Sequence, residues 1–397
     1  MDRTAYFDNA ATTYPKPTCV YDFMDKFYRA EGASAGRGKH RLTSESSRLI
    51  SGTRVLVKEL LCCPNKDVVF TPSATAALNM ILQGTVRRLE SKGGAVTAYI
   101  SPFEHNAVTR VLHAIEEDGR CRVKVLPIRD GLVYDMEELR RLFEAEPPSL
   151  LAVSHVSNMC GLVQPVEALC RLAKEYAAVT VLDMAQSAVL VPLETGSDLF
   201  DFAVFAGHKT IMGPFGASGF VKSPTTPLPP VIFGGTGTES ARQDMPDEAP
   251  ARYEPGSMNT HAIAGLNAAL NWWKADADAI RRREAENHRR LLGLLSRYDF
   301  VKLVGIPVEE RLAQANGTGR CTGVVSCLFD GYSAEEMGSV LDEQGIAVRA
   351  GLQCAPLAHR TLGTFPAGTV RFSTQYFTDD ADFAALEEAM EYIKQNR

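Results

Sequence analysis

Two residues near the middle of the sequence have the types and positions needed for amine chemistry on a carbonyl compound. Lys209 lies in the segment FAGHKTIMGP, shortly after the apolar run Phe202 to Phe205. A lysine that is shielded from water or placed near positive charge loses its proton more readily, and the free amine can then form a Schiff base. Taken alone, such a lysine is more often structural, so a second group must support the interpretation.

Asp183 supplies that second group. It ends the apolar run that begins at Val179, and a carboxylate in such a place can pair with the pyridine nitrogen of pyridoxal 5'-phosphate. The protonated ring then serves as an electron sink. An aspartate there can equally cap a helix, so neither residue decides the matter alone. Together, Lys209 and Asp183 favour a pyridoxal-phosphate site.

The region between residues 68 and 221 predicts the scaffold that brings these two residues together. Short runs rich in Val and Ile alternate with polar turns and with longer segments of helical periodicity. This alternation is typical of an α/β fold in which right-handed crossovers join parallel strands and helices cover both faces of the sheet. Strands are expected at Val68 to Thr71, Ala95 to Ser101, Val123 to Ile128, Leu150 to His155, Val179 to Asp183 and Phe202 to Phe205, and helices at Ala74 to Leu89, His105 to Glu117, Met136 to Ala145 and Val166 to Tyr176.

Polar residues follow the expected strands, and ligands of such sheets bind beyond the carboxyl ends of the strands. Ser73, Ala74 and Thr75 begin a helix, whose free backbone N–H groups and positive dipole end suit a phosphate dianion. The other strand ends lead into polar or titratable residues of the same kind, namely His105, Asn158, Asp183, Gln186, His208 and Lys209.

The carboxyl-terminal part of the chain has a different pattern. A segment rich in Pro and Gly, residues 223 to 258, ends the alternation, and a long helical segment from His261 to about Ser296 follows it. The remainder predicts a smaller α+β unit, with strands near Val324 to Phe329, Ile346 to Arg349 and Val370 to Ser373 and helices from Ala334 and Asp380. We therefore expect an N-terminal segment at 1–15, a large cofactor-binding domain at 16–260 and a small domain with its linking helix at 261–397.

Composition and length exclude several classes of protein. The 397 residues are 45% hydrophobic and 23% charged, as in globular enzymes, with a net charge of -6 and no basic run that would bind nucleic acid. The first residues lack the apolar core of a signal peptide, and no run approaches the length needed to span a membrane. Nine cysteines without a CxxC pair or a Cys/His cluster at metal spacing fit a reducing compartment and no metal site. A cytoplasmic location is expected.

Two residues near the carboxyl terminus could act on an amino-acid substrate. Arg371 follows a short strand, and its planar guanidinium can grip an α-carboxylate through two hydrogen bonds. Cys354 lies 17 residues earlier, between Gly351 and Pro356, in an expected loop. A loop cysteine can present a thiolate to a substrate sulfur, whereas a buried cysteine cannot, although an incidental loop thiol is the alternative.

Eight segments resemble, in order and spacing, those of the class V aminotransferase-fold cysteine desulfurases, and the match spans essentially the whole chain. They are DNAATT (Asp8 to Thr13), EHN (Glu104 to Asn106), HVSN (His155 to Asn158), DMAQ (Asp183 to Gln186), GHK (Gly207 to Lys209), EPGSMNT (Glu254 to Thr260), RAGLQCA (Arg349 to Ala355) and VRFS (Val370 to Ser373). The compact RAGLQCA segment and its short distance to Arg371 resemble the group II enzymes.

This resemblance implies a fold-type I pyridoxal-phosphate transferase, with a mainly parallel seven-stranded sheet in the large domain, a smaller α+β carboxyl-terminal domain and a homodimeric assembly. It also implies a role for each matching residue: Lys209 as Schiff-base lysine, Asp183 at the pyridine nitrogen, Gln186 at the ring hydroxyl, His105 stacked on the ring as a catalytic residue, Asn158 near the ring hydroxyl and the substrate carboxylate, Ala74, Thr75 and His208 at the phosphate, Ser257 lent by the neighbouring subunit, Ala11 and Arg371 at the substrate, and Cys354 as nucleophile.

Two positions depart from the family pattern. Ala206 stands where these enzymes often have a hydroxyl residue, which implies one phosphate hydrogen bond fewer. Gln353 stands where a His is frequent just before the cysteine. The departure therefore leaves open which group transfers protons at Cys354.

The expected function is the conversion of L-cysteine to L-alanine, with a persulfide on Cys354 that passes to an acceptor protein or a reductant. Selenocysteine lyase, cysteine sulfinate lyase and class V aminotransferase remain alternatives, because fold and cofactor leave the reaction open. From another class, a noncatalytic sulfur-trafficking scaffold is opposed by the intact set of Lys209, Asp183 and Arg371, and a cofactor-sensing regulator by the lack of a DNA-binding segment.

Overall fold

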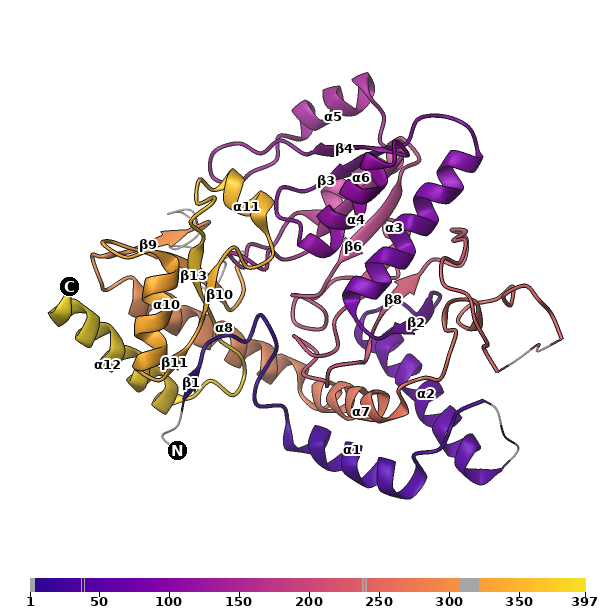
Figure 1. The fold of residues 1–397 in the computed structure, drawn as a ribbon, viewed down its shortest axis with the longest axis horizontal. Coiled ribbons are helices and arrows are strands. Elements are labelled where there is room, and N and C mark those ends of the chain that lie inside the picture. The colour runs from indigo at the N-terminus through magenta and orange to yellow at the C-terminus, as the bar shows by residue number, and fades with distance from the viewer. Residues whose placement is uncertain (1–3, 37, 39, 238, 240, 307–320) are drawn as a thin grey trace.

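The computed structural model describes residues 4–306 and 321–397, apart from residues 37, 39, 238 and 240 (Figure 1). Its largest element is a seven-stranded sheet with the strand order β2-β8-β7-β6-β5-β3-β4. Only β8 runs antiparallel to its neighbours β2 and β7, so the sheet is mainly parallel and the expected fold class is confirmed. The strands are β2 (Asp67–Thr71), β3 (Thr97–Ile100), β4 (Arg122–Val125), β5 (Leu150–Ser154), β6 (Val179–Asp183), β7 (Phe202–Phe205) and β8 (Ser218–Lys222).

Helices cover both faces of this sheet because the central strands are apolar on both sides. Leu151 and Val153 of β5 belong to one apolar cluster, while Leu150 and Ala152 of the same strand belong to another. The second cluster contains α3 (Ala74–Ser91) and α4 (Asn106–Glu117), and the first contains residues of α1 (Thr18–Glu31), α2 (Arg41–Leu60), α5 (Met136–Ala145), α6 (Val166–Glu175) and α7 (Thr260–Ala275). A 3₁₀ turn, η1 (Ala251–Tyr253), precedes α7.

The carboxyl-terminal unit has its own core around a four-stranded antiparallel sheet of order β12-β13-β10-β9. Ala5 and Phe7 pack into this core, because β1 (Ala5–Tyr6) pairs with β11 (Ile346–Ala347). The other strands are β9 (Val301–Val304), β10 (Val324–Phe329), β12 (Arg349–Gly351) and β13 (Thr369–Ser373), and the helices are α8 (Ala277–Leu295), α10 (Ala334–Glu343), α11 (Pro356–Thr361) and α12 (Asp380–Asn396).

The long helix expected from His261 to about Ser296 is divided in two. Asp276 separates α7 from α8, and its side chain accepts a hydrogen bond from the backbone N–H of Ala279 at 3.1 Å, which caps the start of α8. The first helix, α7, packs on α1 and α2. The second, α8, joins the two cores, because Ile280 near its start belongs to the large-sheet cluster while Leu291 and Leu295 near its end belong to the carboxyl-terminal cluster. Within the described ranges, no helix is long and apolar enough to cross a membrane.

Candidate active site

A cavity of about 230 Å³ lies where the carboxyl ends of the large sheet meet the carboxyl-terminal unit. Its walls come from three parts of the chain that are far apart in sequence: the N-terminal segment, the strand ends of the large sheet, and the β12–β13 region. Of the expected site residues only Ser257 is missing from these walls, which contain Ala11, Ala74, Thr75, His105, Asn158, Asp183, Gln186, His208, Lys209, Cys354 and Arg371.

Lys209 lies in the turn that follows β7. Gly207 is required in this turn, because a Cβ atom there would lie 1.9 Å from the carbonyl oxygen of Ala217. The N-terminal segment holds the turn from the other side, since Thr13 Oγ1 donates to the carbonyl of Lys209 at 3.2 Å and Lys16 Nζ to that of His208 at 2.7 Å. Burial lowers the pKa of Lys209 to about 8, against the opposing effect of Asp183, so about a tenth of its amine is free at pH 7, far more than for an ordinary lysine.

Asp183 ends β6 and faces the same cavity. Its Oδ1 accepts a hydrogen bond from the backbone N–H of Ala185 at 2.8 Å, which fixes the carboxyl group. Burial raises the pKa of Asp183, although the Ala185 N–H and the charge of Lys209 act in the other direction. A cationic ring nitrogen beside this carboxyl group would favour its ionised form. Gln186 donates one N–H to the carbonyl of Ala10 at 2.8 Å, which leaves its second N–H for another acceptor.

His105 caps the N-terminus of α4 and lines the cavity. Its Nδ1 accepts a hydrogen bond from the backbone N–H of Ala107 at 3.0 Å. Burial, with a contribution from the charge of Lys209, lowers the pKa of His105 to about 4. The imidazole is therefore neutral at pH 7 with its proton on Nε2, and a neutral flat ring is suited to stack on another ring.

The wall of the cavity also offers groups for an anion. Ser73 caps α3 by accepting from the backbone N–H of Ala76 at 3.1 Å, and the backbone of Ala74 and Thr75 follows at the helix start. Among the described residues, His208 Nδ1 has no hydrogen-bond partner although it is buried, and its ring stacks on Phe215 with centroids 4.5 Å apart. These groups, with the amine of Lys209 and the carboxyl of Asp183, fit an aldehyde-bearing pyridine phosphate. Ala206 lines the same wall without adding a donor.

Two guanidinium groups, those of Arg349 and Arg371, lie on the wall formed by β12 and β13. Arg371 lies within β13 and not after a strand as expected. It is almost fully buried, and it donates to Asp8 Oδ1 at 2.8 Å and to the carbonyl of Asn158 at 3.0 Å. Arg349, on the neighbouring strand, lies opposite Arg371 in the strand register. Because Asp8 compensates Arg371, the second cation leaves an excess of positive charge that suits a substrate carboxylate.

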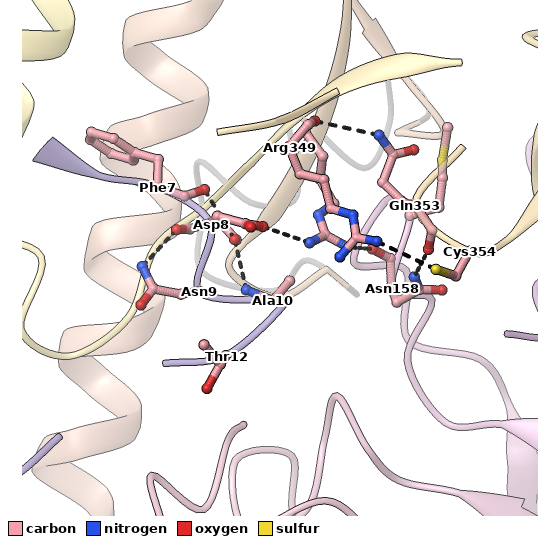
Figure 2. A network of polar contacts seen from close by, with 12 residues as sticks. Phe7, Asp8, Asn9, Ala10, Thr12, Asn158, Arg349, Gln353 and Cys354 are labelled. Atoms are coloured by element: carbon pink, nitrogen blue, oxygen red, sulfur yellow. Dashed lines mark hydrogen bonds and ion pairs between the residues drawn. The ribbon is translucent and has the colours of Figure 1, made fainter. Parts of the chain in front are cut away.

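Cys354 is the cysteine on the wall of this cavity. Arg349 Nη2 lies 3.3 Å from its Sγ, so a cation contacts the sulfur directly. Figure 2 marks this contact between Arg349 and Cys354 with a dashed line. Cys354 is partly exposed, as a nucleophile must be. By contrast, Cys160 is fully buried in an apolar cluster with Phe103 and Met159, and burial raises its pKa.

Ser257 lies in a separate hollow, together with Phe70, Gly216 and Met258. Its segment is held by a buried ion pair, in which Arg54 contacts Glu254 through both terminal nitrogens at 2.8 and 2.6 Å. Ser257 therefore makes no contribution to the cavity of its own chain.

Reasoning from the sequence assigned no role to Glu104, which the structure places directly behind the cavity. Its carboxyl group accepts from the backbone N–H and the hydroxyl of Ser154 at 2.6 and 2.8 Å and contacts the hydroxyl of Ser101. Burial raises the pKa of Glu104 to about 8, so the group is largely neutral at pH 7. Asp8 and Arg349 were also left without a role; their presence in the DNAATT and RAGLQCA segments was the available signal.

Comparisons with known proteins agree with the geometry. A family model described as aminotransferase class V matches residues 5–386. A probable cysteine desulfurase of Vibrio cholerae is 29% identical over 400 residues, covering 98% of this chain and 94% of the relative. A cysteine desulfurase of Pectobacterium atrosepticum is 32% identical over 358 residues, covering 88% and 84% respectively. The apo structure of a cysteine desulfurase from Thermococcus onnurineus matches with a TM-score of 0.86 at 26% identity, covering 99% of this chain and 95% of the other.

Proposed function

Because the chain belongs to the class V aminotransferase family, we propose that it is a pyridoxal-phosphate-dependent cysteine desulfurase, which converts L-cysteine to L-alanine and leaves the sulfur on Cys354. The observation that carries this proposal is the position of the Cys354 thiol. It lies beside Arg349 on the wall of the same cavity that contains the amine of Lys209 and the carboxyl of Asp183. A transaminase needs no thiol at this place.

The cofactor would be held by groups that the cavity already presents. Lys209 would join its aldehyde carbon, Asp183 would face its ring nitrogen, Gln186 its ring hydroxyl and His105 its ring face. The start of α3 at Ala74 and Thr75, together with His208, would receive the phosphate. When bound, the cofactor supplies an electron sink for the charge that develops at the substrate α-carbon.

The remaining steps depend on the chain's own side chains. Arg371 would hold the substrate carboxylate through its planar fork, with Ala11 and Asn158 beside it. The amine of Lys209, with a pKa near 8, would take the α-proton. The Cys354 thiolate would then attack the substrate sulfur, so that an S–S bond forms while the C–S bond breaks. The released electron pair stays with the carbon skeleton, which takes up a proton and leaves as alanine.

The sulfur on Cys354 then requires an acceptor. A thiol of an acceptor protein, or a small thiol reductant, would take the sulfur and return Cys354 to the thiolate. The partly exposed position of Cys354 supports such a transfer. A cytoplasmic location is part of this proposal, because the reducing conditions there would keep the thiol available for the next cycle.

The active unit would be a homodimer. Ser257 lies outside the cavity of its own chain, and Phe215 and Phe233 are 65% and 64% exposed. Phe215 stacks on His208 at the cavity wall, so an apolar surface adjoins the proposed phosphate site. A second copy that covers this surface would bring Ser257 of the partner subunit to the phosphate.

The test is incubation of the cofactor-loaded enzyme with cysteine, followed by mass analysis of the peptide that contains Cys354. One additional sulfur atom is expected on this peptide, together with alanine formed without any added keto acid. The Cys354→Ser variant should retain the cofactor absorbance and lose sulfide release. Alanine formation that requires a keto acid, or normal sulfide release by the Ser variant, would overturn the proposal.

A further inference from the structure

The loop that carries Cys354 has an unusual backbone. Gln353 and Cys354 have φ values of +44° and +57°, so two consecutive residues with side chains adopt the left-handed conformation. This conformation costs free energy for any residue with a Cβ atom, and it persists only where the surroundings impose it. Some contacts must therefore hold the loop.

The side chain of Gln353 supplies such contacts. It is only 3% exposed, and its Nε2 donates to the carbonyl of Thr369 on β13 at 2.8 Å. Its Oε1 lies 2.7 Å from His359 Nε2, and His359 Nδ1 lies 2.7 Å from the hydroxyl of Thr364. The side chain is thus engaged by β13 and α11, while the thiol of Cys354 is engaged by Arg349.

The donor and the acceptor of the two His359 hydrogen bonds follow from the chemistry of the groups and from the charge of the ring. An amide oxygen only accepts, so Nε2 of His359 must carry the proton that it donates to Gln353. Burial lowers the pKa of His359 to about 4, so its ring is neutral at pH 7 and Nδ1 accepts from Thr364. The three side chains form one ordered series, in which Thr364 orients His359 and His359 orients Gln353.

Backbone contacts hold the same two residues from the other side. Asn158 Nδ2 donates to the carbonyl of Gln353 at 2.7 Å, and the backbone N–H of Asn106 donates to the carbonyl of Cys354 at 2.8 Å. Both donors belong to segments that follow strands of the large sheet. The loop is therefore attached to both units of the chain.

We propose that Gln353 is a positioning residue whose side chain, oriented by His359, holds the left-handed turn from which Cys354 presents its sulfur to the cavity. This inference rests on the proposed function for the use that is made of the sulfur. The inference also accounts for the glutamine that stands before the cysteine. Its side chain contacts Thr369 of β13 and His359 of α11 and not the thiol, so it would fix the conformation of the loop and would not transfer a proton to or from Cys354.

The test compares Gln353→Ala with wild type and with the exposed control Gln395→Ala, all as holoenzymes. Backbone hydrogen exchange of residues 352–355 should accelerate about tenfold in Gln353→Ala, because the loop opens more readily. The kcat for alanine formation should fall about 10- to 100-fold, since misplacement of a reacting atom by about 1 Å costs that much. The KM for cysteine and the cofactor absorbance should stay within about twofold of wild type.

A second comparison restores the histidine that is frequent in the family at position 353. Gln353→His can still place a ring N–H toward Thr369 or a ring nitrogen toward His359, so it should recover more of kcat than the Ala variant does. If Gln353→Ala fails to fold, Thr364→Val removes the group that orients His359 and should change both readouts in the same direction by about threefold.

Unchanged hydrogen exchange and unchanged kcat in the folded Ala or Val variant would overturn the inference. Hydrogen exchange of the loop does not depend on the reaction. A wild-type enzyme that forms no persulfide would therefore refute the proposed function while the role of Gln353 in holding the loop is still measured.

Discussion

The turn that carries Lys209 and the loop that carries Cys354 face one cavity, but they are held in different ways. Lys209 follows β7, an interior strand of the seven-stranded sheet, and close backbone packing at Gly207 fixes its turn. Cys354 follows β12, a three-residue edge strand, and its left-handed backbone depends on side-chain hydrogen bonds from Gln353 and Asn158. Sheet packing therefore fixes the amine, whereas a few replaceable side chains fix the thiol.

This difference suits the two tasks in the proposed reaction. The amine must stay aligned with a cofactor that remains bound through every cycle, so a site built on a rigid sheet is favourable. The thiol must reach the substrate sulfur and later meet an acceptor, so a loop whose position rests on local hydrogen bonds is suitable. Substitutions at the two places should consequently have separable effects.

The largest effect on activity is expected in the turn that carries Lys209, which the large sheet holds in place. Lys209→Ala removes the amine that would join the cofactor and take the α-proton, so alanine formation should fall by about 10⁴-fold or more. The visible absorbance after reconstitution with pyridoxal phosphate should also disappear, as a spectrum of the purified protein will show. Retained absorbance in this variant would mean that another amine holds the cofactor. The turn of Lys209 would then not be the place where the cofactor is attached.

A smaller effect is expected where the two regions meet. Arg371→Lys keeps the positive charge beside Asp8 but loses the planar fork, so the KM for cysteine should rise about 10- to 100-fold. The absorbance of the bound cofactor should remain, because Arg371 lies on the β13 wall and not at the proposed ring site. Steady-state kinetics measure the change, and an unaltered KM would assign the carboxylate to another group, with Arg349 the first candidate.

The sequence predicted one of these regions much better than the other. Lys209 and Asp183 were found because parallel strands bring their carboxyl ends to one edge of the sheet, so a residue just after an apolar run can be located without knowing its neighbours. The parallel α/β fold expected from the alternation of strands and helices is confirmed. The class V fold and the desulfurase family, which were expected from the resemblance of eight segments, are confirmed as well. The roles assigned to individual side chains remain predictions for the experiments described above.

The cysteine loop could not be predicted to the same degree. The contacts of Gln353 with Thr369 and His359 join residues 16 and 6 positions apart, and no helical or strand period marks them. The pair of Asp8 and Arg371 spans 363 positions and exists only once β1 has paired beside β11. The break at Asp276 was missed because residues that favour helix stand on both sides of it, whereas the cap is a property of one side chain.

A further substitution tests the thiol side directly. Arg349→Met removes the cation that lies 3.3 Å from Sγ while preserving most of the side chain's length, so alkylation of Cys354 by iodoacetamide at pH 7 should slow about tenfold. The cofactor absorbance should be unchanged, since the cofactor contacts proposed for the large sheet are not altered. Mass analysis of the Cys354 peptide at timed intervals gives the rate, with Arg140→Met as control, because the partly exposed Arg140 pairs with Glu175 and does not line the cavity. Equal alkylation rates in the three proteins would show that Arg349 does not act on the sulfur.

The smallest effect on activity is expected at Glu104, which contacts Ser154 at the end of β5. The Glu104→Gln variant preserves the shape of the carboxyl group and can still hydrogen-bond Ser154. The pKa of Glu104 is raised to about 8 in the folded chain from an ordinary value of 4.5. Between these values the folded protein keeps a proton that the unfolded chain has released, so wild type loses stability as the pH rises from about 4.5 to 8. The glutamine variant lacks this loss, and its stability relative to wild type should increase between about pH 5 and pH 8 while kcat stays within about twofold.

Urea unfolding at pH 5 and at pH 8 measures this change in relative stability, and the exposed Glu144→Gln variant should show no such change. A constant difference between the Glu104→Gln variant and wild type across this pH range would mean that Glu104 is ionised in the folded state, so that this end of the large sheet contains two buried anions instead of one.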